Sequence, residues 1–194
     1  MNTTEPIKNQ EELESFKNYY TRKERNQRNQ TLLTVGLNTA LRISDILSLQ
    51  WGDVFDFEKQ AFREHIIITE QKTQKKSVVF MNDSILHALR KYMGQIDQST
   101  PVKPDNYVLE GNNHQALSRT QAWRIIKKAA NACQIEGIIS PHSLRKTFGY
   151  HSWKKGVPLP VLMELYNHSN QAVTKLYLGI SQDDIDDVYR LIEL

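Results

Sequence analysis

Four side chains in the last third of the sequence have the types and spacing needed for chemistry on a phosphodiester. His142 and Arg145 are three residues apart, and a helix over 143–153 would place them on one face. An arginine fork matches two phosphate oxygens, and a hydroxyl such as that of Tyr177 can be a covalent nucleophile. His168 precedes that tyrosine by nine residues. Together they indicate a segment able to hold and attack a phosphodiester, although His-x-x-Arg alone is more often a basic, solvated helix face.

A second arginine, Arg42, lies among apolar residues in the string Leu41-Arg42-Ile43-Ser44-Asp45. A buried arginine needs partners because an unpaired buried charge is costly, and Asp45 is close enough along a helix to orient it. Two interpretations stay open. The pair is either an ordinary i,i+3 ion pair on a helix or an arginine held rigidly for a ligand, with Asp45 behind it.

Basic residues cluster at two further places. Residues 61–69 and 77–81 are rich in β-branched side chains and predict two strands, and the turn between them carries Lys72, Lys75 and Lys76. Such a turn is usually just solvated, but it can also aim an ammonium group into a groove. The second group follows Ser118, a predicted N-cap, and consists of Arg119, Arg124, Lys127 and Lys128.

Periodic apolar residues predict helices over most of the remaining chain. The first cover 9–20 and 31–41, with a second helix or kinked continuation to 51, and others cover 83–93 and 118–130. In the helix after Ser118, Trp123, Ile126 and Ala130 are expected to face inward. Four more are expected at 143–154, 158–166, 170–178 and 182–193. One strand pair in a mostly helical chain indicates an α+β class, organised as a loose leader (1–9) and one domain (10–194).

Composition narrows the class of protein. The 194 residues carry a net charge of +3, which permits nucleic-acid binding without demanding it. No apolar run has the length of a membrane span, and the N-terminus lacks a signal pattern, so we expect a cytoplasmic protein with no membrane association. The single cysteine, Cys133, has no disulfide partner, and no ligand cluster suggests a metal or other cofactor.

Six of these side chains occur in an order that resembles the catalytic set of the tyrosine recombinases, the phage integrase family. The set is Arg42, Lys72, His142, Arg145, His168 and Tyr177. The strings Ala40-Leu-Arg-Ile-Ser-Asp45 and His142-Ser-Leu-Arg-Lys-Thr147 are similar to the family's two arginine boxes. The resemblance covers about 10–194, with Lys146 where histidine is common and Asn167 where glycine usually precedes the histidine. In extent the chain is similar to the short invertases of fimbrial phase variation, without a separate core-binding domain.

The resemblance implies the catalytic-domain fold of that family and a DNA breaking and rejoining enzyme of a mobile genetic element. Tyr177 would attack a DNA phosphorus and form a 3′-phosphotyrosyl link. Arg42 and Arg145 would hold the non-bridging oxygens, and Lys72 would protonate the leaving 5′-oxygen. No metal and no ATP would be required, because the covalent link stores the energy for rejoining.

The remaining roles follow from the same resemblance. His142 would assist proton transfer at the nucleophile, His168 would hydrogen-bond the phosphate and Asp45 would orient Arg42. The partner would be double-stranded DNA, bound by a homo-oligomer, a tetramer on paired sites. The DNA backbone would be contacted by Lys75, Lys76, Arg119, Arg124, Lys127, Lys128 and Lys146.

Several alternatives stay open. The chain could be a DNA-binding regulator on a recombinase fold, or a type IB topoisomerase-like enzyme without strand exchange. Tyr150, Tyr166 and Tyr189 are rival nucleophiles, with Tyr166 expected to be a packing residue. The C-terminal segment, capped by Ser181 and Asp184, has an apolar stripe that either folds back on its own domain or, as the resemblance implies, docks on a neighbouring protomer.

Overall fold

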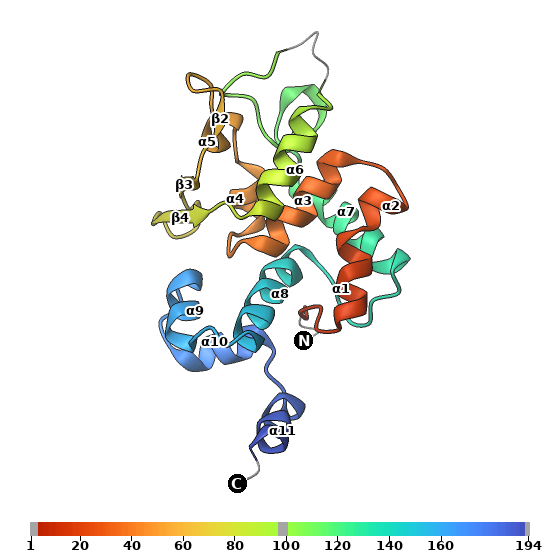
Figure 1. Cartoon of the computed structure of the whole chain (residues 1–194), viewed down its shortest axis with the longest axis vertical. Coiled ribbons are helices and arrows are strands. Elements are labelled where there is room, and N and C mark those ends of the chain that lie inside the picture. The colour runs from red at the N-terminus through yellow and green to blue at the C-terminus, as the bar shows by residue number, and fades with distance from the viewer. Residues whose placement is uncertain (1–3, 97–100, 193–194) are drawn as a thin grey trace.

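The computed structural model describes residues 4–96 and 101–192. Helices dominate, with short antiparallel strands on one side, so the predicted α+β class is confirmed (Figure 1). The first half of the chain forms one body around α3, and the last third adds a smaller helical layer. The site described below lies between these two parts.

The N-terminal helices differ from the prediction at their ends. Their bounds are α1 (Gln10–Lys17), α2 (Tyr19–Arg22), α3 (Gln27–Asn38), α4 (Ile43–Leu47) and α5 (Trp51–Val54). The helix expected over 9–20 breaks at Asn18, whose side-chain amide donates to the Glu14 carbonyl at 2.8 Å and competes with the helical backbone. The α3 helix ends at Asn38, so Arg42 is the extended N-cap residue of α4 and does not lie inside a helix.

The strands form two separate antiparallel hairpins. They are β1 (Phe55–Asp56), β2 (Ala61–Phe62), β3 (His65–Thr69) and β4 (Lys76–Phe80). The β3–β4 pair is the predicted one, in a register that sets Ile66 opposite Val79. The β1–β2 pair was not predicted, because two-residue strands leave no alternating pattern to detect.

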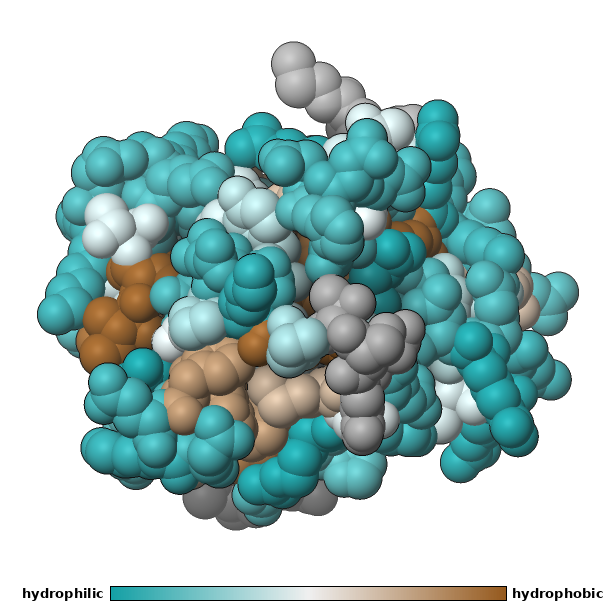
Figure 2. All heavy atoms as spheres, turned by 90° about the horizontal axis from the view of Figure 1, so that it is seen from above, coloured by the Kyte–Doolittle hydropathy of each residue, from teal (hydrophilic) through white to brown (hydrophobic). Residues whose placement is uncertain are grey.

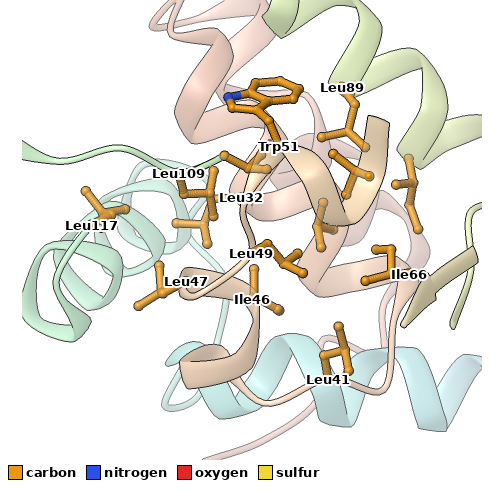
Figure 3. Packing of buried hydrophobic residues seen from close by; sticks show 14 of the residues in the cluster. Leu32, Leu41, Ile46, Leu47, Leu49, Trp51, Ile66, Leu89, Leu109 and Leu117 are labelled. Atoms are coloured by element: carbon orange, nitrogen blue, oxygen red, sulfur yellow. The ribbon is translucent and has the colours of Figure 1, made fainter. Parts of the chain in front are cut away.

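The main core joins the N-terminal helices to the strands and to the middle of the chain. Figure 3 shows Leu32, Ile46, Trp51, Ile66 and Leu89 converging there from α3, α4, α5, β3 and α6 (Asp83–Met93). Next come η1 (Asn112–His114) and α7 (Arg119–Ala132), which begins at the predicted Ser118 cap.

One predicted inward residue of α7 is wrong. The Trp123 side chain is 41% exposed, and Ala122 occupies the buried position beside Ile126. Ile126 and Ala130 are buried as predicted, and because adjacent helical positions lie about 100° apart, Trp123 lies at the edge of this inner face.

The last third is made of α8 (Pro141–Lys154), α9 (Leu159–Tyr166), α10 (Gln171–Leu178) and α11 (Gln182–Leu191). A small core of Leu162, Tyr166 and Leu178 holds α9 and α10 against α8. A Cβ atom added at Gly149 of α8 would overlap the Tyr166 hydroxyl and the Leu178 side chain. The absence of a side chain at Gly149 therefore sets how closely these helices approach.

The predicted loose leader is held against α8. Ile7 is buried, its N–H donates to Thr147 Oγ1 at 2.8 Å, and its carbonyl lies 2.9 Å from His151 Nε2. The Glu5 N–H donates to the Ile138 carbonyl at 3.2 Å. Residues 5–7 are thus part of the packed structure.

The tail helix α11 is anchored at its first turn and otherwise projects from the molecule (Figure 1). Asp184 is 6% exposed and accepts hydrogen bonds from Tyr150 and Lys8, at 2.8 and 3.1 Å. In contrast, the apolar stripe at Ile185, Val188 and Leu191 is 45–79% exposed. The structure therefore does not show the stripe folded back on its own domain, which was one of its two interpretations.

The outer surface is mostly polar. Seen from above in Figure 2, hydrophilic side chains cover most of the face, and apolar side chains reach it in small patches. Within the described residues, every helix is too short or too polar to span a lipid bilayer.

The Asp184 anchor leads to a stability prediction. Burial raises the pKa of this carboxyl, but the Ser181 N–H, Tyr150 and Lys8 outweigh it, and the pKa falls well below its usual range. Asp184→Asn should therefore lower the free energy of unfolding at pH 7 by about 3 kcal/mol, measured by urea denaturation. A lowered folded pKa stabilises above the unfolded pKa of about 3.9, so the difference between wild type and variant should shrink as pH falls below that value.

The control is Asp187→Asn, one turn along α11. Asp187 is half-exposed and pairs with Lys154 and Arg190 at the surface, so this substitution should change the free energy of unfolding little. Equal effects of the two substitutions would contradict the anchoring role of Asp184.

Candidate active site

Aromatic, imidazole and guanidinium groups from α8, α10 and the α9–α10 loop meet around one tyrosine. The ring centroid of Tyr177 lies 5.3 Å from that of His142 and 5.1 Å from that of His168. The guanidinium carbon of Arg145 lies 5.9 Å from the Tyr177 centroid. The structure thus brings together the four side chains that the C-terminal sequence pattern singled out.

Local sequence explains why His142 and Arg145 share a face. The Ser140 side chain accepts from the His142 N–H at 3.2 Å, and Pro141 occupies the first helical position, where its missing N–H costs nothing. Both features start α8 immediately before the histidine. The three-residue spacing then directs both side chains toward α10.

Arg145 is the most buried cation of the site, at 4% exposure. Its Nη2 donates to the Tyr166 carbonyl at 3.3 Å, and its guanidinium carbon lies 4.8 Å from the Tyr166 ring centroid. Burial lowers the pKa of Arg145, an effect that nearby Tyr177 partly offsets. An arginine stays charged even so, and the Nε of Arg145 has no protein partner among the described residues.

The Tyr177 hydroxyl is buried and, within residues 4–96 and 101–192, makes no hydrogen bond. Burial raises its pKa to about 12, although the charges of Arg145 and Arg42 oppose the rise. An unpaired buried hydroxyl lowers the stability of the fold unless a ligand forms a hydrogen bond with it. The phenol is therefore neutral at pH 7 and positioned for a group that is not part of the chain.

Both histidines are neutral at pH 7. His142 faces solvent at one edge, but burial of the ring against its neighbours lowers its pKa, and the charges of Arg145 and Lys146 lower it further. Burial and Arg145 also lower the pKa of His168, whose Nδ1 lies 3.0 Å from Thr174 Oγ1. Each ring can therefore accept a proton or donate one N–H hydrogen bond.

Arg42 joins the site from the other side and has a different carboxylate partner from the one expected. Its Nη1 forms an ion pair with Glu70, whereas Asp45 Oδ1 accepts from the Gln71 N–H at 3.0 Å. In the described part of the chain, Asp45 and Arg42 form no ion pair with each other. Sequence reasoning missed Glu70, and the available signal was a single acidic residue at the start of a basic turn.

Lys72 is exposed in the turn that the Asp45–Gln71 bond ties to α4. The charges of Arg42 and Lys72 each lower the pKa of His142, so both cations act on the same region of space as the histidine. All six side chains of the sequence-predicted set are thus linked by contact or by electrostatic coupling.

A comparison with protein families decides the identity. The model of the phage integrase family matches residues 8–183. The chain belongs to the phage integrase family.

Named relatives agree with this assignment. The chain is 34% identical over 192 residues to the probable integrase/recombinase YoeC of Bacillus subtilis and covers 98% of both chains. It is 26% identical over 165 residues to the tyrosine recombinase XerD of Listeria monocytogenes, covering 84% of this chain and 54% of XerD. The chain therefore spans nearly all of YoeC and about half of XerD, and the predicted family is confirmed.

Solved structures show the same fold. The crystal structure of XerA recombinase matches with a TM-score of 0.75 and 19% identity over 97% of this chain and 66% of XerA. The XerH site-specific recombinase, in a post-cleavage complex with its palindromic difH substrate, matches with a TM-score of 0.77 and 21% identity over 97% of this chain and 53% of XerH. The described residues of this family member hold no cluster of histidine, cysteine or acidic side chains suited to a metal ion.

The basic residues predicted to contact DNA have different surroundings in this integrase-family chain. Lys146 donates to the Thr4 carbonyl at 2.7 Å and lies 5.5 Å from the Tyr177 ring centroid, so it is part of the site. Lys128 pairs with Glu24 at 2.5 Å, and Lys127 lies over the Trp123 ring. The side chains of four others are exposed: Lys75, Lys76, Arg119 and Arg124.

The unpaired hydroxyl predicts opposite effects for two neighbouring tyrosines. Tyr177→Phe removes a buried polar atom without a partner and should raise the free energy of unfolding by about 1 kcal/mol in urea denaturation. Tyr166→Phe is the matched control, since the Tyr166 hydroxyl donates to the Arg145 carbonyl at 2.8 Å. The free energy of unfolding of Tyr166→Phe should therefore fall by about 1 kcal/mol. Destabilisation by Tyr177→Phe would mean that the hydroxyl has a structural partner.

Proposed function

We propose that this chain is a site-specific DNA recombinase that cleaves and rejoins double-stranded DNA through a 3′-phosphotyrosyl intermediate at Tyr177. The observation that carries the proposal is the buried, unpaired Tyr177 hydroxyl among cations and neutral imidazoles. A phosphodiester supplies what this arrangement lacks, an anion for the guanidinium groups and an electrophile for the phenol.

In the cleavage step, a bond forms between Tyr177 Oη and phosphorus while the bond from phosphorus to the 5′-oxygen breaks. The phenol, with a pKa of about 12, is protonated at pH 7 and must lose its proton during attack. His142 is neutral and adjacent, so it accepts that proton. Arg42 and Arg145 bind the non-bridging oxygens and stabilise the charge that develops on them.

The leaving 5′-oxygen receives a proton from Lys72, which is exposed in the hairpin turn and near enough to His142 for its charge to act there. His168 donates a hydrogen bond to a phosphate oxygen, held in place by Thr174. Rejoining runs the same steps in reverse, with a 5′-hydroxyl attacking the phosphotyrosine. A metal ion has no role in this scheme.

The working form would be a homo-oligomer on paired sites, as a tetramer. Similar solved structures include XerH bound to its palindromic difH substrate and a lambda integrase dimer bound to a COC′ core site. The exposed stripe of α11 gives each protomer an apolar surface for docking on a neighbour. Residues 10–194 would form the catalytic domain, preceded by the segment 1–9, and the exposed cations would contact DNA phosphates.

The proposed nucleophile can be tested with a trapped intermediate before the DNA target site has been identified. The substrate is a library of DNA duplexes that carry a randomised stretch beside a nick. Cleavage releases the short 5′-hydroxyl fragment, so the strand cannot be rejoined. The DNA then stays covalently attached to the protein and can be sequenced. Wild type should accumulate adduct, and Tyr177→Phe should bind DNA with unchanged affinity and form none, because only the hydroxyl is lost. Adduct from Tyr177→Phe would refute the assignment, and a two-site assay on the recovered sequence separates recombination from topoisomerase activity alone.

The second prediction concerns the leaving group. Lys72→Ala should slow cleavage of an ordinary phosphodiester by on the order of 10²–10⁴. It should cleave a 5′-phosphorothiolate at nearly the wild-type rate, because a thiolate leaves without a proton. Lys75→Ala, in the same turn, is the control and should change neither rate. An equal loss on both substrates would make Lys72 a phosphate-binding group.

A further inference from the structure

One buried carboxylate receives hydrogen bonds from three segments beside the candidate active site. Glu70 is 2% exposed and forms an ion pair with Arg42. It also accepts from Thr73 Oγ1 at 2.6 Å, Ser77 Oγ at 2.8 Å and Asn167 Nδ2 at 3.2 Å. A carboxylate with this many donors is fully satisfied in a site where a solitary charge would be costly.

Glu70 must be ionised to fill this place. Burial raises its pKa, but the hydrogen bonds from Thr73, Ser77 and Arg42 outweigh burial, and the net shift is downward. All four partners act as donors to the two carboxylate oxygens. An uncharged amide at this position would turn an N–H group toward some of these donors, so a glutamine cannot reproduce the arrangement.

The donors come from three segments, and two of these, α4 and the hairpin turn, are also tied by the hydrogen bond from the Gln71 N–H to Asp45 Oδ1. Arg42 is the N-cap residue of α4, Thr73 and Ser77 belong to the β3–β4 hairpin, and Asn167 begins the α9–α10 loop. The hairpin turn carries Lys72, and the loop carries His168. Glu70 therefore links the segments that present three of the candidate active-site side chains.

Asn167 suits this link because of its backbone conformation. It ends α9 with φ 55°, in the left-handed region that asparagine tolerates better than most residues. A glycine would also adopt this conformation, but it would have no amide to donate to Glu70. The asparagine thus combines the turn before His168 with a hydrogen bond to the carboxylate.

We propose that Glu70 is a positioning residue that fixes Arg42, the Lys72 turn and the His168 loop relative to one another for phosphodiester cleavage. The inference rests on the proposed function. Glu70 occupies one nitrogen of the Arg42 fork, and the other donors of Arg42 have no protein partner among the described residues. The ion pair therefore orients the fork while leaving donors for the non-bridging oxygens of the phosphate.

The test compares Glu70→Gln with wild type on a duplex recovered from the adduct library. The single-turnover cleavage rate should fall by about 10²-fold, the cost of a small misplacement of reacting groups, while the dissociation constant for DNA stays within about threefold. Arg42→Ala and the double variant complete a cycle. Because Glu70 also positions the Lys72 turn and the His168 loop, adding Glu70→Gln to Arg42→Ala should slow cleavage further, but by a smaller factor than Glu70→Gln does in the wild-type background. Independent, multiplying losses, or a wild-type rate for Glu70→Gln, would overturn the inference.

A second pair of variants decides the matter if Glu70→Gln does not fold. Asn167→Asp keeps the left-handed backbone but sets a carboxylate against Glu70, and should slow cleavage at least about tenfold. Asn113→Asp is the matched control, since Asn113 is exposed, also has a left-handed φ of 56°, and is not among the hydrogen-bond partners of Glu70 in the described residues. Equal rates for these two variants would contradict the role of Glu70. Absence of adduct from the wild type would instead refute the proposed function, so the two failures are distinguishable.

Discussion

A reciprocal pair of hydrogen bonds between α8 and α9 determines where the rest of the site lies. The Tyr166 hydroxyl donates to the Arg145 carbonyl at 2.8 Å, and Arg145 Nη2 donates to the Tyr166 carbonyl at 3.3 Å. The ring of Tyr166 also stacks on His168 and contacts Tyr177, with centroids 5.3 and 5.0 Å apart. Because Gly149 leaves room for Tyr166, this single contact places the guanidinium, the imidazole and the phenol together. Loosening it would displace all three.

Charge in the site is strongly unbalanced. The charges of Arg145, Lys146, Arg42 and Lys72 act on His142, and those of Arg145 and Arg42 also act on His168, while the buried Glu70 pairs with Arg42. Burial, together with this excess positive charge, lowers the pKa of both imidazoles and keeps them neutral at pH 7, and the charge is available to an anion. The same field lowers the cost of ionising Tyr177, but burial dominates and its phenol stays protonated until a base takes the proton. Binding of an anionic phosphate would thus neutralise the excess positive charge of the site.

Some of this arrangement could be predicted from the sequence, and some could not. The His142–Arg145 spacing, the α6 helix and the Ser118 and Ser181 caps depend on neighbours a few residues apart, so local patterns reveal them. The Glu70 contacts with Arg42 and Asn167 cross 28 and 97 residues, and no periodicity records such pairs. The exposure of Trp123 and the packing of Ile7 likewise depend on tertiary neighbours, whereas the break at Asn18 comes from a local hydrogen bond to the Glu14 carbonyl that apolar periodicity does not record. The resemblance to tyrosine recombinases was needed to group the six side chains into one site. Their spacing alone indicates only separate basic helix faces and a basic turn.

The packing of residues 5–7 against α8 has a consequence for the protein during its synthesis. Ile7 leaves the ribosome well before its hydrogen-bond partners, Thr147 and His151, which lie 140 and 144 residues further along the chain. Contacts of such long range form late, because the chain between them must be made and closed first. Arg42 and Lys72 also emerge well before Tyr177. A nascent chain can therefore present these cations to nucleic acid before Tyr177, the proposed nucleophile, has been made.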